Sequence, residues 1–249
     1  MLRFTFIIIF FTIIGCRNKN SDNMAVQDIV DKSIEVSGGN LNSLCNISFA
    51  LRDVRYELEN SKGKRVLKRI SKKDSTVFLD VLKHSGFQRY INGIPVNVAD
   101  SMATKYSNSI NSVHYFAYLP YGLNDPAVNK KLLGETQIGD RQYYKVEVTF
   151  DEKDGGEDFD DVYLYWFDKE TFKPDYLAYE FHVDGGGTRF REAFNERIIN
   201  GIRFVDYNNY KAADNISVYE LEALFKTEEL ELLSRIRLEN IEVNPDNCN

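Results

Sequence analysis

The chain has 249 residues, and its 38 acidic side chains outnumber its 31 basic ones, which leaves a formal net charge of −7. Phosphate binding needs a net basic surface or a basic stripe, so this composition argues against nucleic acid as a partner. Hydrophobic residues make up 43% of the chain, enough for a packed core, while five prolines and three cysteines exclude collagen-like, proline-rich and disulfide-framework proteins.

The N-terminal residues combine one positive charge with a short apolar run. Arg3 precedes residues 4–14, which are apolar apart from two threonines. Eleven residues are too few for a stable membrane anchor, but they match the apolar region of a signal peptide. Gly15 and Cys16 follow, and a small residue directly before cysteine is typical of a bacterial lipoprotein signal.

This pattern predicts that residues 1–15 are a signal peptide and that Cys16 is the lipid attachment site, whose acyl chains, palmitate among them, bind the membrane. The alternative is an ordinary signal peptide with a coincidental cysteine. Residues 16–23 are polar and turn-forming, and we interpret them as a lipidated tether. One domain is then predicted over residues 24–249.

Two further cysteines, Cys45 and Cys248, lie outside the signal. An extracytoplasmic compartment permits a disulfide between them. The alternative is two unpaired thiols, one of them buried as a small hydrophobic side chain. The sequence leaves both open, because Cys248 lies in a terminal segment that is expected to fray.

The predicted elements begin with a helix over residues 24–37, whose apolar side chains recur at the spacing of one helix face and which ends at Gly38-Gly39. Asn92-Gly93 is a strong hairpin signal, because both central residues of a type I′ turn need positive φ. Five strands are predicted in this part, over residues 45–58, 64–71, 76–83, 86–91 and 94–98.

After these strands the apolar spacing changes to the helical period. A helix is predicted over residues 100–118, capped by Asp100 and ending near Pro120. A shorter helix follows over residues 125–133, with proline in its first turn and glycine after its end. Because the first helix interrupts a series of hairpins, it has to cover one face of the sheet. We expect this helix and the loop to Gly122 to form a movable lid.

The second half returns to strands, apart from a helix predicted over residues 218–234. Residues 162–167 are apolar or aromatic on both faces, so we expect this strand to be covered on both sides. The predicted strands are residues 143–150, 162–167, 176–183, 188–194, 202–210 and 235–243.

These elements amount to roughly eleven strands, most of them linked by hairpins, with two or three inserted helices. The chain shows no β–α–β alternation, which argues against a parallel sheet. We therefore predict an α+β fold with a single large curved antiparallel sheet, an incomplete β-barrel of about eleven strands, and helices packed on its concave face.

Three stretches carry a resemblance to a known family: the helix that ends at Gly38-Gly39, residues 143–150 (YYKVEVTF) and residues 164–172 (LYWFDKETF). Over most of residues 24–243 the chain resembles the LolA/LolB lipoprotein-carrier superfamily. The resemblance implies a leading helix, an incomplete antiparallel barrel and inserted helices that cover an apolar cavity. Because this chain has its own lipid attachment signal, it implies a membrane-bound protein like LolB rather than a freely shuttling carrier.

Two further segments, residues 115–128 (YFAYLPYGLNDPAV) and 185–191 (GGGTRFR), are similar to an uncharacterised family of bacterial lipoproteins with a domain of unknown function. That family has no established activity. The similarity therefore implies a fold and adds little about function.

Aromatic side chains are the candidate ligand-binding residues. An apolar site with few polar groups suits an acyl chain or the lipid of a lipoprotein, and the superfamily resemblance implies such a cavity. The alternative is that these rings belong to the plain core. The residues predicted to line the groove are Tyr115, Phe116, Tyr118, Tyr121, Trp166, Tyr179 and Phe181.

Neither a metal site nor a cofactor nor a catalytic motif is predicted. His84, His114 and His182 are scattered, and no pair has metal-ligand spacing. The acidic run 151–161 does not match a calcium-loop pattern, and we interpret it as a solvated hairpin loop. The sequence contains neither a G-x-S-x-G elbow nor a phosphate-binding loop.

Two arginines follow a glycine-rich segment that we interpret as a turn needing positive φ. Arg189 and Arg191 fall on one face of a strand, where we expect them to pair with Glu180 or Asp206 across the sheet. The alternative partner is an acidic ligand headgroup.

These observations predict a non-catalytic, lipid-anchored protein of a Gram-negative cell envelope, at the outer membrane facing the periplasm, which binds a lipid or a lipoprotein. One alternative is a hydrolytic enzyme that uses paired carboxylates from Asp160, Asp161 and Asp206. The other alternative is an envelope interaction or structural module without a small ligand.

Overall fold

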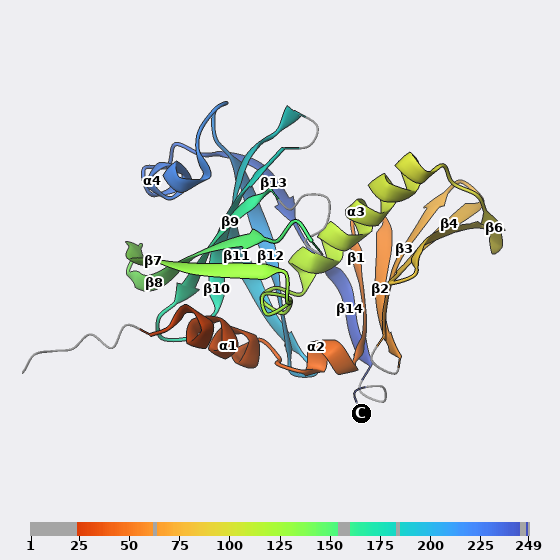
Figure 1. Cartoon of the computed structure of the whole chain (residues 1–249), viewed down its shortest axis with the longest axis horizontal. Helices are drawn as coiled ribbons and strands as arrows, with labels where there is room; N and C mark the ends of the chain where they lie inside the picture. The colour runs from red at the N-terminus through yellow and green to blue at the C-terminus, as the bar shows by residue number, and fades with distance from the viewer. Residues whose placement is uncertain (1–23, 62–63, 154–159, 183–184, 245–247, 249) are drawn as a thin grey trace, which may run out of the picture.

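The structure, a computed structural model, describes residues 24–61, 64–153, 160–182, 185–244 and 248 (Figure 1). Within these ranges the strands form two antiparallel sheets of seven strands each. The N-terminal sheet has the order β14 (Glu239–Asn244), β1 (Asn46–Leu51), β2 (Val54–Ser61), β3 (Lys64–Lys73), β4 (Thr76–Lys83), β5 (Gly86–Ile91) and β6 (Ile94–Val96). The C-terminal sheet has the order β13 (Glu231–Ile236), β12 (Ile202–Lys211), β11 (Gly187–Ile199), β10 (Pro174–Phe181), β9 (Val162–Asp168), β8 (Arg141–Phe150) and β7 (Val128–Ile138).

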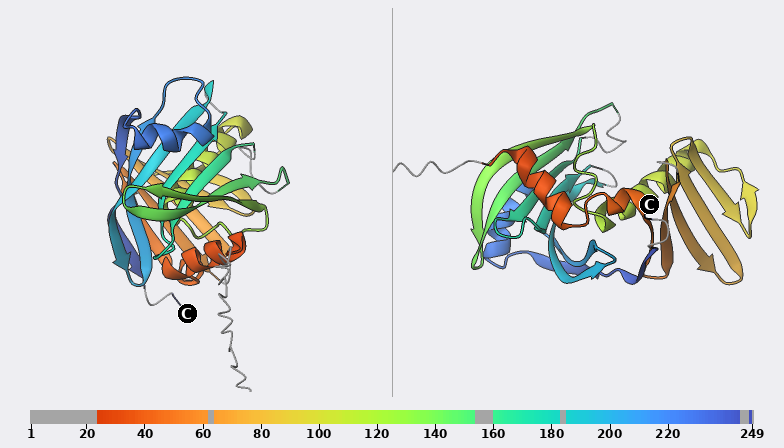
Figure 2. Two further views of the ribbon diagram at one scale, coloured as in Figure 1. Left: turned by 90° about the vertical axis from the view of Figure 1, so that its left-hand side faces the viewer. Right: turned by 90° about the horizontal axis from the view of Figure 1, so that it is seen from below.

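The helices lie between and around these sheets. They are α1 (Val26–Val36), α2 (Leu41–Leu44), α3 (Asp100–Ala117), the 3₁₀ turn η2 (Val218–Glu220) and α4 (Leu221–Lys226). Figures 1 and 2 show α1 along the C-terminal sheet and α3 running across the face of the N-terminal sheet. Ala99, rather than the predicted Asp100, is the N-cap of α3, and the Asp100 carboxylate lies in the first turn, where the helix dipole favours it. No helix of the described residues is both long enough and apolar enough to cross a membrane.

The C-terminal sheet is covered on both faces, as predicted for residues 162–167. Side chains alternate along β9, so Tyr165 and Phe167 join the core that contains α1. Leu164 and Trp166 point to the opposite face and join the core that contains η2 and α4. Helices therefore pack on both faces of this sheet, whereas only the concave face was predicted to carry them.

A third core joins the two sheets. Phe49 and Leu58 of the N-terminal sheet belong to the same cluster as Phe204 of β12 and Tyr118, which follows α3. The chain also crosses between the sheets after β13, because β14 pairs with β1. The first and last described strands of the chain thus lie side by side in the N-terminal sheet.

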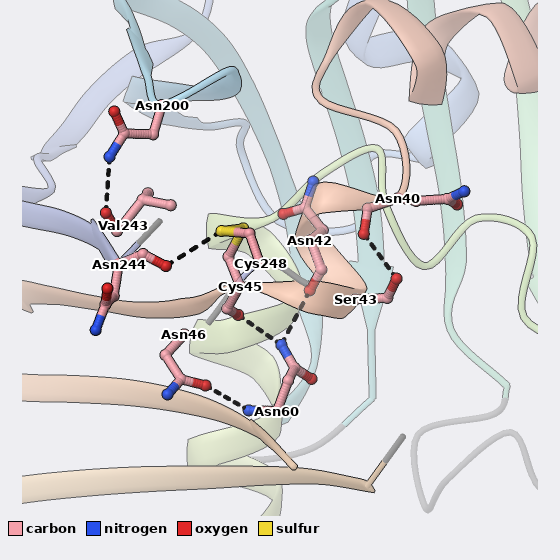
Figure 3. Close-up of a disulfide and its surroundings, with 10 residues drawn as sticks. All are labelled: Asn40, Asn42, Ser43, Cys45, Asn46, Asn60, Asn200, Val243, Asn244 and Cys248. Atoms are coloured by element: carbon pink, nitrogen blue, oxygen red, sulfur yellow. Dashed lines mark hydrogen bonds between the residues drawn. A yellow bond between two sulfur atoms is a disulfide. The ribbon is translucent and has the colours of Figure 1, made fainter. Parts of the chain in front are cut away.

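A disulfide links Cys45, directly before β1, with Cys248 at the C-terminal end of the chain (Figure 3). Around it, the Asn60 side chain donates to the carbonyl of Cys45 over 2.6 Å, and Asn200 donates to the carbonyl of Val243 over 2.8 Å. Of the two states that the sequence leaves open for these cysteines, the structure has the bridge.

The fold class agrees with the prediction, since the protein is α+β with curved antiparallel sheets that do not close into a barrel. The predicted single sheet of about eleven strands is divided into two sheets, with fourteen strands in the described ranges. α3 and the loop after it separate β6 from β7, so no hydrogen-bond ladder continues across this insertion.

Local turn signals predict the structure well. Asn92-Gly93 has φ values of 49° and 80°, and Asn200-Gly201 has 46° and 85°, as the two hairpin turns require. α1 ends at Val36 with Ser37 as its C-cap, one residue before the predicted Gly38-Gly39, and the Gly39 N–H donates to the carbonyl of Ile34 over 2.8 Å. β4 and β5 have the predicted bounds.

The helix predicted over residues 125–133 is wrong, because most of this segment belongs to β7. Lys130 lies opposite Val148, and Leu132 lies opposite Val146, in the ladder with β8. Over so short a segment the apolar residues fit either period, and the hydrogen bonds supplied by β8 decide for a strand. Gly134 does not cap a helix but lies at a bulge, with φ of 131°.

The single strand predicted over residues 45–58 is two strands, β1 and β2. The chain turns at Arg52-Asp53, where Arg52 has φ of 55° and Leu51 pairs with Val54. The segment lacks the Asn-Gly or Asp-Gly signal of such a turn, so the periodicity alone did not reveal it.

The helix predicted over residues 218–234 ends at Lys226, and Glu228, with φ of 60°, turns the chain toward β13. The strand predicted over residues 235–243 is divided between β13 and β14. Leu232 pairs with Tyr210 of β12. This apolar residue of the predicted helix therefore belongs to β13, a strand at the edge of the C-terminal sheet.

Several predicted features lie outside the described residues. They are the signal peptide, the tether with Cys16, residues 154–159 of the acidic run, and the end of the strand predicted over residues 176–183.

Candidate functional site

A cavity of about 830 Å³ lies between α3 and the N-terminal sheet, a size typical of small-molecule sites. Strands β3 and β4 and the turn after β4 form one side, and the C-terminal half of α3 with the following loop forms the other. Leu67 and Leu82 contribute apolar surface from the strands, and tyrosine rings contribute it from the loop. The wall is mainly apolar.

The N-terminal half of α3 is held on the sheet by two arginines that share one buried carboxylate. Arg69 and Arg89 each form an ion pair of 2.6 Å with Asp80. The Arg89 guanidinium lies 3.8 Å from the ring centre of Tyr106, and Arg69 donates to Ser109, both on α3. Burial opposes the charged form of Asp80, but the hydrogen bonds from the two arginines outweigh it, so the pKa of Asp80 lies below its usual value.

A buried histidine fixes Tyr118 at the wall of the cavity. Nε2 of His114 lies 3.2 Å from the carbonyl oxygen of Lys68, and Nδ1 lies 3.1 Å from the hydroxyl of Tyr118. Because a carbonyl only accepts, Nε2 carries the proton and Nδ1 accepts from Tyr118. His114 is 2% exposed, and burial lowers its pKa to about 4, so the ring is neutral near pH 7.

Arg65 brings a positive charge to this mainly apolar cavity. Its guanidinium lies 5.2 Å from the ring centre of Tyr121 and 6.0 Å from that of Tyr118. Its Nε is buried without a hydrogen-bond partner, and Arg65 forms no ion pair with a carboxylate of the described residues. Asp125 lines the same cavity, where burial raises its pKa and the charges of Arg65 and Lys130 oppose that rise. Arg65 therefore brings to the cavity a positive charge that has no ion-pair partner among the described residues, and an anion could neutralise it.

Three of the seven predicted aromatic residues line this cavity, namely Tyr115, Tyr118 and Tyr121. Tyr115 also reaches the C-terminal sheet, because its hydroxyl lies 2.9 Å from that of Tyr165. The C-terminal end of α3 thus contacts both the cavity at the N-terminal sheet and the core of the C-terminal sheet.

Three further predicted residues form an aromatic row over the C-terminal sheet instead. The ring centres of Phe116 and Tyr179 are 5.5 Å apart, and those of Tyr179 and Phe181 are 6.0 Å apart. Tyr163, which was not predicted, stacks on Tyr179 at 5.5 Å. These rings pack on one another and do not line the cavity beside Arg65.

Trp166 lies apart from both groups. Its indole N–H donates to Glu222 over 3.1 Å, and its ring packs 5.3 Å from that of Phe190. Strand alternation places it on the face of β9 opposite to Tyr163 and Tyr165. For Trp166 the core interpretation therefore holds.

Arg189 and Arg191 do not form the predicted ion pairs with Glu180 or Asp206. Arg191 is 8% exposed, donates to the hydroxyl of Tyr179 over 2.9 Å, and lies 4.0 Å from the ring centre of Phe116. Arg189 lies over an aromatic ring as well. The register of β11 places both away from Asp206, which lies opposite Phe194.

Of the three carboxylates in the predicted hydrolytic alternative, Asp160 and Asp161 lie close together, whereas Asp206 is engaged by other partners. Asp206 is paired with Arg197 over 2.7 Å and accepts from the backbone N–H of Leu238. Burial opposes its charge, but these hydrogen bonds keep the pKa of Asp206 below its usual value. Asp160 and Asp161 lie before β9, beside a histidine, and not in the cavity.

Arg65 carries no signal in the sequence that distinguishes it from its neighbours. Lys64, Arg65, Lys68 and Arg69 all lie on β3, in a pattern typical of a solvated strand. Only the packing of α3 over β3 makes Arg65 part of a cavity.

Comparison with solved structures shows a LolA-type fold. The chain is similar to a LolA superfamily protein from Nitrosomonas europaea, with a TM-score of 0.50 and 15% identity over 90% of this chain and 96% of that one. It is also similar to a DUF1329 family protein from Desulfovibrio piger, with a TM-score of 0.48 and 10% identity over 88% of this chain and 93% of that one. The first similarity confirms the predicted resemblance at the level of the fold.

The family is shown by the sequence itself. Residues 3–240 match the model of a family of unknown function, DUF6503, and the chain belongs to that family. No curated protein matches the chain. Membership of a family without a known activity agrees with the second resemblance predicted from residues 115–128 and 185–191.

Proposed function

We propose that this protein is a membrane-anchored envelope lipoprotein that binds an amphiphile, an acyl chain with an anionic head, in the cavity beneath α3 and does not act as an enzyme. The observation that carries the proposal is the combination of a mainly apolar cavity of about 830 Å³ with Arg65, which lines it and forms no ion pair with a carboxylate of the described residues. An apolar chain fits the first feature, and an anion fits the second.

The apolar part of the ligand supplies most of the binding free energy. Each methylene removed from water contributes about 0.8 kcal/mol, so ten of them contribute about 8 kcal/mol before ordering costs are subtracted. Leu67, Leu82 and Tyr118 offer surface for this contact. The anionic head then fixes the orientation of the chain, because a charge-assisted hydrogen bond to Arg65 is stronger than one between neutral groups.

The polar groups of the cavity favour binding over catalysis. His114 is neutral, and both of its ring nitrogens are engaged by Lys68 and Tyr118, so it is poorly placed as a general base. The lipoprotein-carrier role implied by the LolA/LolB resemblance is also a binding role, and it enters here as an analogy from the fold.

The location follows from the N-terminus. Cys16 becomes the lipidated first residue, residues 16–23 form the tether, and residues 24–249 form the ligand-binding domain. The acyl chains hold the protein at the cell envelope of a Gram-negative bacterium, on the outer membrane facing the periplasm.

Uptake of cis-parinaric acid, a fluorescent fatty acid, by residues 17–249 tests the proposal. The native protein should bind the probe saturably. Asn111→Trp, which places an indole in the cavity from an exposed position of α3, should weaken binding at least about tenfold, since one lost apolar contact of this size exceeds about 1.4 kcal/mol. Ser112→Trp is the matched control, because Ser112 is exposed on the same helix and does not line the cavity.

Arg65→Met tests the anionic head separately. The variant should lose affinity for the fatty acid but keep its affinity for the corresponding alcohol. Absence of saturable binding to the native protein, or equal binding by the two tryptophan variants, contradicts the proposal.

A further inference from the structure

A cluster of possible metal ligands lies at one end of the β9–β10 pair, away from the cavity. Asp160 and Asp161 precede β9, His182 follows β10, and Glu180 pairs with Val162 between them. The antiparallel pairing therefore brings together residues that are about twenty positions apart in the sequence.

The ligand atoms are close enough to share one ion. Nδ1 of His182 lies 3.4 Å from a carboxylate oxygen of Asp161 and 3.6 Å from one of Asp160. One ligand atom from each of the three residues lies within 4.8 Å of the others. These separations are short enough for the three atoms to surround one ion after small side-chain rotations.

Charge and burial favour a cation at this point. Asp161 is only 5% exposed, while Asp160 and His182 are about half exposed and leave access from solvent. Neither Asp160 nor Glu180 forms an ion pair with a lysine or arginine of the described residues. Three carboxylates thus surround one imidazole, and their mutual repulsion is relieved by a bound cation.

The second ring nitrogen of His182 lies near a third carboxylate. Nε2 lies 3.9 Å from a carboxylate oxygen of Glu180, whereas Nδ1 is the nitrogen that lies near the two aspartates. A histidine that binds a metal through one nitrogen commonly directs the other toward a carboxylate, which orients the ring. A small rotation of the Glu180 side chain would bring its carboxylate within hydrogen-bonding distance of Nε2 for that role.

We propose that Asp160, Asp161 and His182 bind one divalent transition-metal ion, with Glu180 orienting the histidine. One imidazole nitrogen with two carboxylate oxygens is a ligand set suited to Zn²⁺, which takes a water as its fourth ligand in such sites. Ca²⁺ prefers six to eight oxygen ligands and gains little from an imidazole. The bound ion fastens the start of β9 to the end of β10.

Calorimetric titration of the full-length protein in detergent with ZnCl₂, after removal of bound metal with a chelator, tests this site. The native protein should bind one Zn²⁺ per chain and unfold at a higher temperature when Zn²⁺ is present. His182→Gln and Asp161→Asn should each weaken Zn²⁺ binding at least about tenfold. Asp140→Asn, which removes an exposed carboxylate from the turn after β7, should leave it unchanged.

Because His182 is half exposed, His182→Gln should fold normally and decides the test if Asp161→Asn does not fold. The proposal is overturned if the native protein does not bind Zn²⁺, or if it binds Zn²⁺ no more tightly than the folded His182→Gln variant. A preference for Ca²⁺ that persists in His182→Gln also overturns it, since the histidine would then not be a ligand.

Discussion

Removal of the disulfide by Cys248→Ser should strongly destabilise this protein, and the size of the effect follows from the chain length that the bridge encloses. Cys45 and Cys248 are 203 residues apart. In the chain-entropy model a loop of this length restricts the unfolded chain by about 18 cal/mol/K, or about 5 kcal/mol at 25 °C. The total stability of a domain is about 5–15 kcal/mol, so the loss is a large share of it.

The native structure itself should change little in this variant. Cys248 is only partly buried, and β14 remains paired with β1 through residues before it. The effect therefore arises in the unfolded state, where the free chain gains conformations that the bridge forbids.

Urea unfolding of native and Cys248→Ser proteins, followed by circular dichroism without reductant, measures the difference. The variant should have a lower midpoint and a steeper dependence on urea, because its unfolded chain is less compact. In a thermal scan its melting temperature should fall by about 10–20 °C. Dithiothreitol should shift the native protein to the behaviour of the variant and leave the variant unchanged. Equal midpoints for the two oxidised proteins refute this reasoning.

Three further predictions concern the lipid anchor at Cys16, the ion pairs of Asp80 with Arg69 and Arg89 that hold α3 on the sheet, and the lid. Cys16→Ala should leave the fold intact, as circular dichroism will show, and move the protein from the membrane pellet to the soluble fraction; continued sedimentation with membranes means that the anchor lies elsewhere. Asp80→Asn should lower the free energy of unfolding by about 3 kcal/mol near pH 7, because it leaves two arginines around a buried site without their counter-charge. The pKa of Asp80 is lowered in the folded state, so its stabilisation is fully present above the unfolded pKa of 3.8. The difference in free energy of unfolding between the native protein and the variant should therefore shrink as the pH falls below that value. A difference that stays constant contradicts the assignment. Hydrogen exchange should be faster in residues 115–125 than in residues 143–150 and 202–210, and equal protection in all three segments would make the end of α3 fixed core rather than a lid.

The sequence by itself determined the features that depend on a few neighbouring residues. Asn92-Gly93 and Asn200-Gly201 each place two residues with positive φ between strands. Such a pair between two apolar runs is typical of a tight hairpin turn, so the turn is predictable from these residues alone. The family resemblance and the α+β class also came from local patterns. α3 was predictable because its apolar spacing extends over five turns, longer than any competing strand pattern.

Short segments with ambiguous periodicity were decided only by the tertiary structure. Residues 128–133 are strand because β8 supplies a ladder of hydrogen bonds, and Arg52 adopts positive φ because the pairing of β1 with β2 requires a turn there. In both cases the long-range partner contributes more free energy than the local preference opposes.

Both candidate sites depend on contacts between residues far apart in the chain. Arg65 faces a cavity because α3 crosses over β3, and His182 meets Asp160 and Asp161 because β9 and β10 are antiparallel. Trp166 was expected to line the same groove as Tyr179, yet the alternation of β9 turns it to the opposite face. A sequence pattern reports the spacing of side chains along one element, whereas a binding site is made by the packing of several elements, and that packing is set by the burial of apolar surface over the whole chain.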